Sequence, residues 1–349
     1  MAWKPLQDPM LDSAMHAMHN LNYERSLAIF REMEGNIYAP LGKLLVEWYR
    51  GVGLYGHNFD KKILIGQSDE LIAFYEKALK ENPDSTELNL CAALAIGFKS
   101  RIMVSDHNSF FVMLNGIESL KYLRRVDELS TDNPDLEFSK GVFEYYISKY
   151  PGIIQYFANL LLDTTGDRES GRARMHRAAE SEGFLKYDAN FLLAFLYLYI
   201  ENNPDKAREF IDLLVREFPK NPNYHFLKTF YFLQRDQTEA AELSYEQFIN
   251  SIDVNCPYYL HEFRNRKDFL AALIALKKQD LKKAYGLFQS FLENYGLELE
   301  HLKAIALLEQ GKIQDFWGNS KEARKFYKAV IKVGNNTYPI HDAEVLLKR

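Results

Sequence analysis

The sequence predicts an all-α protein, a solenoid of about eight degenerate helix pairs closed by a C-terminal capping segment. Three observations support this prediction. Apolar residues recur at intervals of three and four in successive segments, a small residue repeatedly precedes larger apolar residues, and prolines or glycines separate the segments. No stretch alternates apolar and polar residues over the length of a strand, so a sheet is not expected.

Residues 204–223, PDKAREFIDLLVREFPKNPN, are the clearest copy of the repeating unit. An amphipathic helix ends at a proline, and an Asn-Pro turn then begins another helix. The second helix of a tetratricopeptide repeat needs a small residue where it crosses the first, apolar residues one and two turns later, and a terminal proline. Ala207, Ile211, Leu214 and Pro219 occupy these positions. The unit therefore resembles a tetratricopeptide repeat, which implies a right-handed superhelix when such units stack.

The first half of the chain divides into helices at glycine, proline and asparagine breaks. Three pairs are expected, at residues 11–21 and 23–34, 38–54 and 68–80, and 86–104 and 110–129. Residues 55–65 form an insertion that is longer than a repeat turn requires. An atypical fourth pair is expected at 136–150 and 168–179, because Pro151 interrupts the helical pattern.

The second half follows the template more regularly. Pairs are expected at residues 187–200 and 205–217, 224–233 and 239–249, 258–277 and 281–295, and 298–310 and 320–332. Several second helices carry a small residue followed by aromatic residues one turn later, at Ala241, Tyr245 and Phe248, at Ala284, Phe288 and Phe291, and at Ala323 and Tyr327. Residues 341–349 are expected to cap the array with a polar end.

At 349 residues the chain exceeds the usual size of one hydrophobic core, yet no composition break marks a linker. A stacked array resolves this, since its core lengthens along one axis as repeats are added. We therefore predict a single helical-repeat domain over residues 1–349. Aromatic residues make up 14% of the chain, and the simplest reason is that large rings pack between short helices.

The charge balance bears on partners and compartment. The formal charge is −5, from 43 basic and 48 acidic residues, so the chain as a whole does not attract nucleic acid and none is expected as a partner. The N-terminal residues MAWKPLQDPM contain no apolar signal segment. A cytoplasmic protein is therefore expected, or a periplasmic or exported one if a signal has been removed. Residues 152–162, GIIQYFANLLL, are too short to span a bilayer and are expected to form a buried helix.

Between residues 141 and 222 the order of features is more specific. GVFEYYISKYP is followed by an apolar stretch ending LLLDTTGDRESG, then by ARMHRAAESEG and LAFLYLYIENNPDKAREFIDLLVREFPKNP. This block resembles the tetratricopeptide repeat protein 39 and inclusion-body clearance family and its bacterial relatives, and the compact bacterial form agrees best. The matching positions are Gly141, Pro151, Gly166, Asp167, Arg168, Gly171, Ala178, Ala179, Ala207, Pro219 and Pro222.

The resemblance implies a noncatalytic scaffold or adaptor. Some eukaryotic members of the family are linked to lipid-droplet or sterol handling. The resemblance transfers no ligand-binding residues to this chain.

The residues of the Gly-Asp-Arg turn by themselves also predict a structural role. Asp167 can cap the helix that follows, while Gly166 and Gly171 permit a tight turn and a close approach of helices. Arg168 can pair with a carboxylate of a neighbouring repeat. The alternative is an anion site, but of the four arginines between residues 168 and 177 only Arg168 and Arg172 share a helical face.

Motifs for chemistry are incomplete, so no enzyme, metal site or cofactor is predicted. His16 and His19 stand three residues apart on an expected helix without a third ligand. His261-Glu262 lacks the second histidine of a zinc-protease motif, since Asn265 stands there. Phosphate-loop, dinucleotide and nucleophile-elbow motifs are missing from the sequence. Cys91 lies among apolar residues, as a packing thiol does, and Cys256 is too distant in sequence to form a CxxC pair with it.

Aromatic residues on the first helices of successive pairs are the candidate binding residues. In such solenoids the first helices line the concave surface, which can accept a peptide. The candidates are Tyr145, Tyr146, Phe195, Tyr199, Phe230, Tyr231, Tyr258 and Tyr259. We expect a scaffold that binds a peptide or protein partner in this groove. The alternative is a carrier or sensor of an apolar, lipid-like ligand held in the central helical pairs around residues 152–162.

Overall fold

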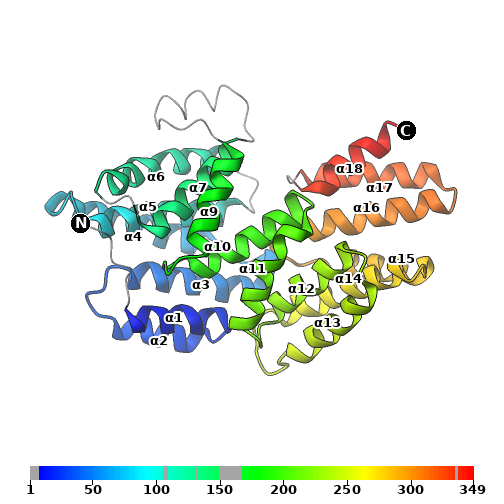
Figure 1. Ribbon diagram of the computed structural model, residues 1–349, viewed down its shortest axis with the longest axis horizontal. Coiled ribbons are helices and arrows are strands. Elements are labelled where there is room, and N and C mark those ends of the chain that lie inside the picture. The colour runs from blue at the N-terminus through cyan, green and yellow to red at the C-terminus, as the bar shows by residue number, and fades with distance from the viewer. Residues whose placement is uncertain (1–7, 105–108, 130–131, 149–166, 335–336) are drawn as a thin grey trace. The chain divides into compact units, whose positions relative to one another are not determined.

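The computed structural model describes residues 8–104, 109–129, 132–148, 167–334 and 337–349, and in these residues the secondary structure is entirely helical (Figure 1). The predicted fold class is confirmed. The contacts divide the chain into two compact units, which we describe separately. Unit 1 comprises Met1–Arg50 and Asp60–Asn190, and unit 2 comprises Gly51–Phe59 and Phe191–Arg349. The single continuous domain stays a prediction.

The helices that begin in unit 1 are α1 (Pro9–His19), α2 (Tyr23–Glu32), α3 (Ala39–Tyr55), α4 (Lys62–Glu81), α5 (Thr86–Val104), α6 (Ser109–Leu129), α7 (Pro134–Ile147), α9 (Arg168–Ala179) and α10 (Lys186–Phe195). Most agree with the predicted segments within a few residues. The exception is the predicted insertion at residues 55–65, which contains a 3-10 turn at Gly56–Asn58 and the start of α4. The helix begins early because Asp60 accepts the backbone amide of Lys62, at 3.1 Å, and Leu64 is buried.

Unit 2 contains a π-helical turn, η2 (Leu196–Ile200), and then α11 (Pro204–Glu217), α12 (Pro222–Gln234), α13 (Thr238–Ser251), α14 (Leu260–Lys277), α15 (Leu281–Glu293), α16 (His301–Phe316), α17 (Ser320–Val333) and α18 (Tyr338–Leu347). Two predicted details are wrong. The helix expected to reach residue 200 changes to π geometry at Leu196. The helix expected to end before Gly311 continues to Phe316, because Gly311 faces the Tyr327 ring instead of ending the helix.

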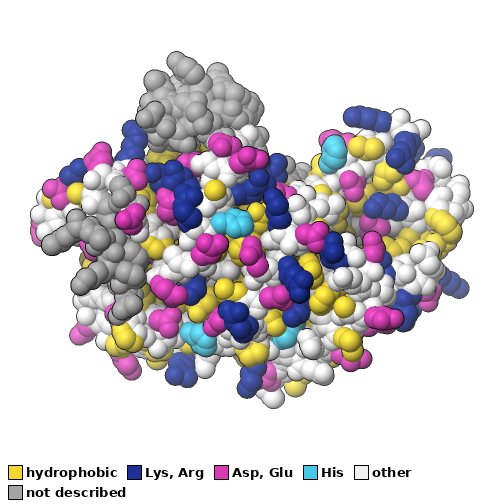
Figure 2. Space-filling view, in the orientation of Figure 1, with side chains coloured by type: hydrophobic (Ala, Val, Ile, Leu, Met, Phe, Trp, Pro, Cys, Tyr) yellow, Lys and Arg dark blue, Asp and Glu magenta, His cyan; other side chains and the backbone are white. Residues whose placement is uncertain are grey.

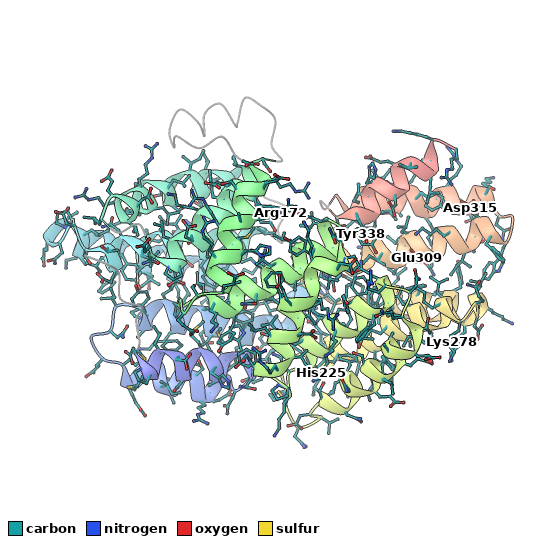
Figure 3. All side chains as sticks on the ribbon, in the orientation of Figure 1. Arg172, His225, Lys278, Glu309, Asp315 and Tyr338 are labelled. Atoms are coloured by element: carbon teal, nitrogen blue, oxygen red, sulfur yellow. The ribbon has the colours of Figure 1, made fainter. Side chains whose placement is uncertain are left out.

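The small-residue template is confirmed in the core. Ala207, Ile211 and Leu214 are at most 1% exposed, and the small residues Ala241 and Ala284 of the later copies are fully buried. A small buried residue takes up little space between neighbouring helices, as the template requires. The capping helix α18 begins three residues before the predicted start. Its Ala343 packs with α16 and α17, and Tyr338 lies near Glu309 of α16 (Figure 3).

In unit 1 two glycines lie where α7 crosses α9. A Cβ atom on Gly171 would lie 2.7 Å from the carbonyl oxygen of Gly141 and 2.7 Å from the amide nitrogen of Tyr145. A Cβ atom on Gly141 would lie 2.6 Å from the carbonyl oxygen of Gly171. Backbone atoms on both sides leave no room for a methyl group, so the close approach expected of Gly171 is confirmed.

We expect Gly171→Ala to destabilise unit 1 by about 3 kcal/mol, because α7 and α9 must separate to accommodate the methyl group. Gly97→Ala in α5 is the matched control, since nothing lies within 4 Å of the added Cβ atom there. The control should be neutral or stabilising by up to about 1 kcal/mol through helix propensity. Thermal unfolding followed by circular dichroism measures both changes, and equal melting temperatures for the two variants would contradict the crossing.

Candidate functional site

Most of the predicted aromatic residues lie inside the helical core. Tyr145, Tyr199, Phe230, Tyr231, Tyr258 and Tyr259 are between 0% and 7% exposed. Tyr146 and Phe195 retain partly exposed side chains. The six buried rings therefore offer little surface to a partner in this structure, and ring packing between helices accounts for them.

In unit 2 three of these rings form one cluster. Phe195 and Tyr199 lie 4.9 Å apart between ring centroids, and Tyr199 stacks on Phe230 at 5.1 Å with an interplanar angle of 14°. His301 of α16 completes the cluster, at 4.5 Å from Tyr199 and 5.1 Å from Phe195. The π-helical turn carries Tyr199 into this position. Burial raises the pKa of Tyr199, so its hydroxyl stays protonated.

Tyr258 and Tyr259 pack elsewhere in unit 2. A Cβ atom on Gly53 would lie 3.0 Å from the Tyr259 ring and 3.2 Å from the Tyr258 Cβ atom. Tyr259 has a left-handed backbone, with φ of 60°, and its amide donates to the Gly53 carbonyl at 2.6 Å. These two tyrosines therefore fix the start of α14.

Part of the structural role predicted for the turn before α9 is confirmed. The Asp167 carboxylate accepts the backbone amides of Glu169, at 3.0 Å, and Ser170, at 3.1 Å, and so caps the helix as predicted. Gly166 and the apolar residues 152–162 lie outside the described residues. Arg168 donates to the Tyr145 hydroxyl at 3.1 Å, with its guanidinium 5.2 Å from that ring.

Arg172 remains on α9 as the second arginine of the predicted face (Figure 3). It lies 3.8 Å from Glu169, one turn earlier.

The sequence did not reveal a carboxylate network between α7 and α9. Glu144, 8% exposed at its side chain, accepts from the Arg174 guanidinium at 3.1 Å and from the Ser170 hydroxyl at 2.9 Å. Glu137 accepts from Arg174 at 2.5 Å and from Arg177 at 2.9 Å. Arg174 and Arg177, further along α9, thus pair with carboxylates of the neighbouring helix α7. The paired carboxylates neutralise Arg174 and Arg177, so these two arginines do not form a concentrated positive site.

A second buried charge pair, also missed, lies in α14. Glu262 is 2% exposed, and Arg266 donates to its carboxylate at 3.0 Å. The Arg266 guanidinium also lies 5.2 Å from the Phe226 ring and donates to Asn223. Burial raises the pKa of Glu262 to about 7, and the attraction of Arg266 only partly opposes that shift. The signal in the sequence was an acidic residue four positions before an arginine on an expected helix.

In the described part of the chain, the other candidate residues for chemistry are not brought together into a site. No group of three or more His, Cys, Asp or Glu residues there could hold a metal ion. His19 lies 3.6 Å from Asp188, whose carboxylate also accepts from Tyr49 at 3.0 Å. Cys91 is buried, and burial raises the pKa of its thiol above the ordinary value. A surface hollow of about 460 Å³ in unit 2 is lined by Tyr245, Glu246, Ile249, Asn250 and Lys267, and the predicted aromatic residues do not line it.

Comparisons with known proteins agree with the repeat geometry. Residues 188–221 match the family model of the tetratricopeptide repeat, at the place where the template is clearest. A human IFIT1 dimer with m7Gppp-AAAA is similar over 99% of this chain and 86% of that chain, at 15% identity and a TM-score of 0.50. Yeast Tom70 is similar over 97% of this chain and 81% of that chain, at 11% identity and a TM-score of 0.39. The comparison with curated proteins found no match.

These findings establish a helical-repeat solenoid with a tetratricopeptide repeat at residues 188–221. At 15% identity the similarity to IFIT1 shows the fold alone. Within the described ranges, no helix is both long enough and apolar enough to cross a membrane.

We expect the stability of unit 2 to fall as the pH rises, because Glu262 must ionise inside the core. Its folded-state pKa lies above the ordinary value of 4.5. The stabilising contribution is therefore complete below about pH 4.5 and is lost as the pH rises through about 7. Glu262→Gln keeps a neutral side chain at every pH. Between pH 4.5 and pH 7 the free energy of unfolding of the variant should rise by on the order of 3 kcal/mol relative to that of the natural protein.

Urea unfolding at several pH values from 4.5 to 8 measures this difference. Glu246→Gln, at an exposed carboxylate of α13, is the control. Its profile should run parallel to that of the natural protein. If the Glu262→Gln profile were also parallel to that of the natural protein, burial would not perturb the pKa of the Glu262 carboxyl.

Proposed function

We propose that this chain is a noncatalytic interaction scaffold that binds a peptide or protein partner along the first helices of its repeats. The observation that carries the proposal is the tetratricopeptide repeat at residues 188–221 within an array of helix pairs. Such repeats present a continuous surface whose residues can vary while the small residues at the helix crossings are kept. Recognition of a partner is therefore a role that the fold supports without a catalytic centre.

The partly exposed rings are the best candidates for direct contact. Tyr146 of α7 and Phe195 of α10 each keep part of their surface exposed, and each packs against one of the buried rings, Tyr146 on Tyr145 and Phe195 on Tyr199. Phe195 rests on Tyr199 and His301, so it is held in one orientation. A preorganised aromatic side chain contributes to binding with little loss of conformational entropy.

The resemblance of residues 141–222 to the tetratricopeptide repeat protein 39 and inclusion-body clearance family stays part of this proposal. The Asp167 cap and the crossing of Gly141 with Gly171 give three of its matching positions a structural reason. Family members in this group are described as scaffolds, which fits the proposed role.

RNA is the competing class of partner, because the similar human IFIT1 structure contains m7Gppp-AAAA. We favour a protein partner for this chain. Its formal charge is −5, and Arg174 and Arg177, which could otherwise contact phosphates, are paired with Glu137 and Glu144. Phosphate binding depends on uncompensated basic residues.

Affinity capture of the full chain from its native host, followed by mass spectrometry for protein, lipid and RNA, tests the proposal. We expect a protein partner to be enriched. Tyr146→Ala combined with Phe195→Ala should reduce its recovery by about tenfold, because exposed aromatic anchors dominate such interfaces. Val254→Ala, at a loop side chain that is 76% exposed, should leave recovery unchanged.

A folded double variant is required for this comparison, and circular dichroism checks it. Recovery of a lipid or an RNA without any protein would contradict the proposed scaffold. Equal recovery by the double variant and the control would show that the partner binds elsewhere on the chain.

A further inference from the structure

The outer face of α17 carries a row of lysines that the fold itself does not use. Lys321, Lys325, Lys328 and Lys332 follow at intervals of four, three and four residues, so they share one helical face. All four are exposed, and they lie opposite the buried face of the helix, formed by Ala323, Tyr327 and Val330. The row extends about 16 Å along the helix axis.

The row is largely uncompensated. In the described residues Lys325 alone of the four forms an ion pair, with Glu322 at 2.6 Å, and both of those side chains are about half exposed or more. Several surface lysines elsewhere in unit 2 form ion pairs, for example Lys278 with Glu242 at 2.7 Å. With five basic residues and one acidic residue, α17 has a formal charge of +4 in a chain whose total charge is −5.

The stability of the helix does not explain the row. Like charges one turn apart destabilise a helix, and a lysine in the first turn, such as Lys321, opposes the helix dipole. The helix is held instead by its buried face and by the Tyr327 hydroxyl, which donates to Asp315 of α16 at 2.6 Å. Arg324 donates to the Leu347 carbonyl of α18 at 3.1 Å and so belongs to the packing. The lysine row is thus presented on a fixed helix.

Exposed aromatic residues adjoin the N-terminal end of the row. Phe316 is 74% exposed and Trp317 is 41% exposed, four to five residues before Lys321. The Trp317 ring lies 5.3 Å from Tyr285, which lies 6.3 Å from Phe326 of α17. Figure 2 shows dark-blue side chains at the upper right, over the region of α17 and α18, with hydrophobic side chains beside them. Positive charge and an apolar anchor site therefore occur together.

Resting on the proposed scaffold function, we propose that this surface docks an acidic helical segment of a partner protein. Carboxylates at the same spacing of four, three and four residues would face the ammonium groups one to one, and an apolar residue at one end would contact Phe316 and Trp317. The row is a single side chain wide, and Glu322 borders it. A flat anionic membrane would also contact the Glu322 carboxylate, which would repel it. A narrow helix can contact the lysines without contacting Glu322. Lysine also lacks the bidentate geometry that makes arginine the usual residue for phosphate recognition.

Fluorescence anisotropy with a labelled acidic peptide tests the docking surface on the full chain. The peptide carries glutamates at the same spacing and leucines at one end, and its partner control has lysines in place of the glutamates. We expect the acidic peptide to bind and the basic one not to bind. Binding should weaken steeply as salt rises from about 50 mM to about 300 mM, because exposed charges are screened.

The decisive variant is Lys321→Glu with Lys328→Glu and Lys332→Glu, which should lower the affinity by at least about tenfold. The matched control is Lys62→Glu with Lys77→Glu and Lys220→Glu, three exposed lysines away from α17 with the same change in net charge. The control should change the affinity by less than about twofold. Melting temperatures verify that both variants are folded.

Equal losses of affinity for the acidic peptide in the two triple variants would overturn the docking surface, since the effect would then depend only on net charge. Tighter binding of single-stranded RNA or of phosphatidylserine vesicles, with the same dependence on the α17 lysines, would overturn the choice of an acidic protein. If the peptide fails to bind while affinity capture recovers a protein partner, the docking surface is wrong and the scaffold function stands.

Discussion

The array depends on small residues at the points where two helices cross. Gly141 and Gly171 bring the backbones of α7 and α9 together so closely that neither position could carry a methyl group. Gly311 leaves room for the Tyr327 ring of α17, and the small residues Ala207 and Ala284 are fully buried in two other helix pairs. Once the backbones approach this closely, the larger side chains one turn away must fill the space on either side. The spacing of small and large residues is therefore the physical reason for the repeat.

This constraint also explains why the aromatic residues are mostly buried. A first helix in a repeat has neighbours on both sides, so its rings are enclosed by helices that are distant in sequence. Tyr199 is packed against Phe230 of α12 and His301 of α16. Helical periodicity identifies the face on which Tyr199 lies, but it does not say whether another repeat covers that face. For this reason the sequence predicted the positions of the rings but not which of them another helix would cover.

Local features were predictable, and contacts between helices were not. The boundaries of α5, the Asp167 cap and the burial of Ala207 all follow from residues within one or two turns. The pairing of Glu144 with Arg174 requires knowledge of how α7 and α9 cross, because thirty positions separate the two residues. The continuation of α16 through Gly311 likewise depends on the Tyr327 ring, which belongs to another helix. Glycine alone would have suggested a helix end.

The two kinds of helix are constrained differently, and this decides where recognition can vary. The first helices α12, α14 and α16 have buried residues around much of their circumference, including the Glu262 carboxylate that must stay close to Arg266. A substitution that leaves a buried polar group without its hydrogen-bond partner is costly, so such positions tolerate little change. The second helices α11, α15 and α17 bury one narrow face each. Charges on their outer faces can change at little cost to folding, since exposed charges contribute at most about 1 kcal/mol. A scaffold of this kind can therefore add contacts to a partner on its second helices, beside those proposed for its first helices, without disturbing the packing of the first.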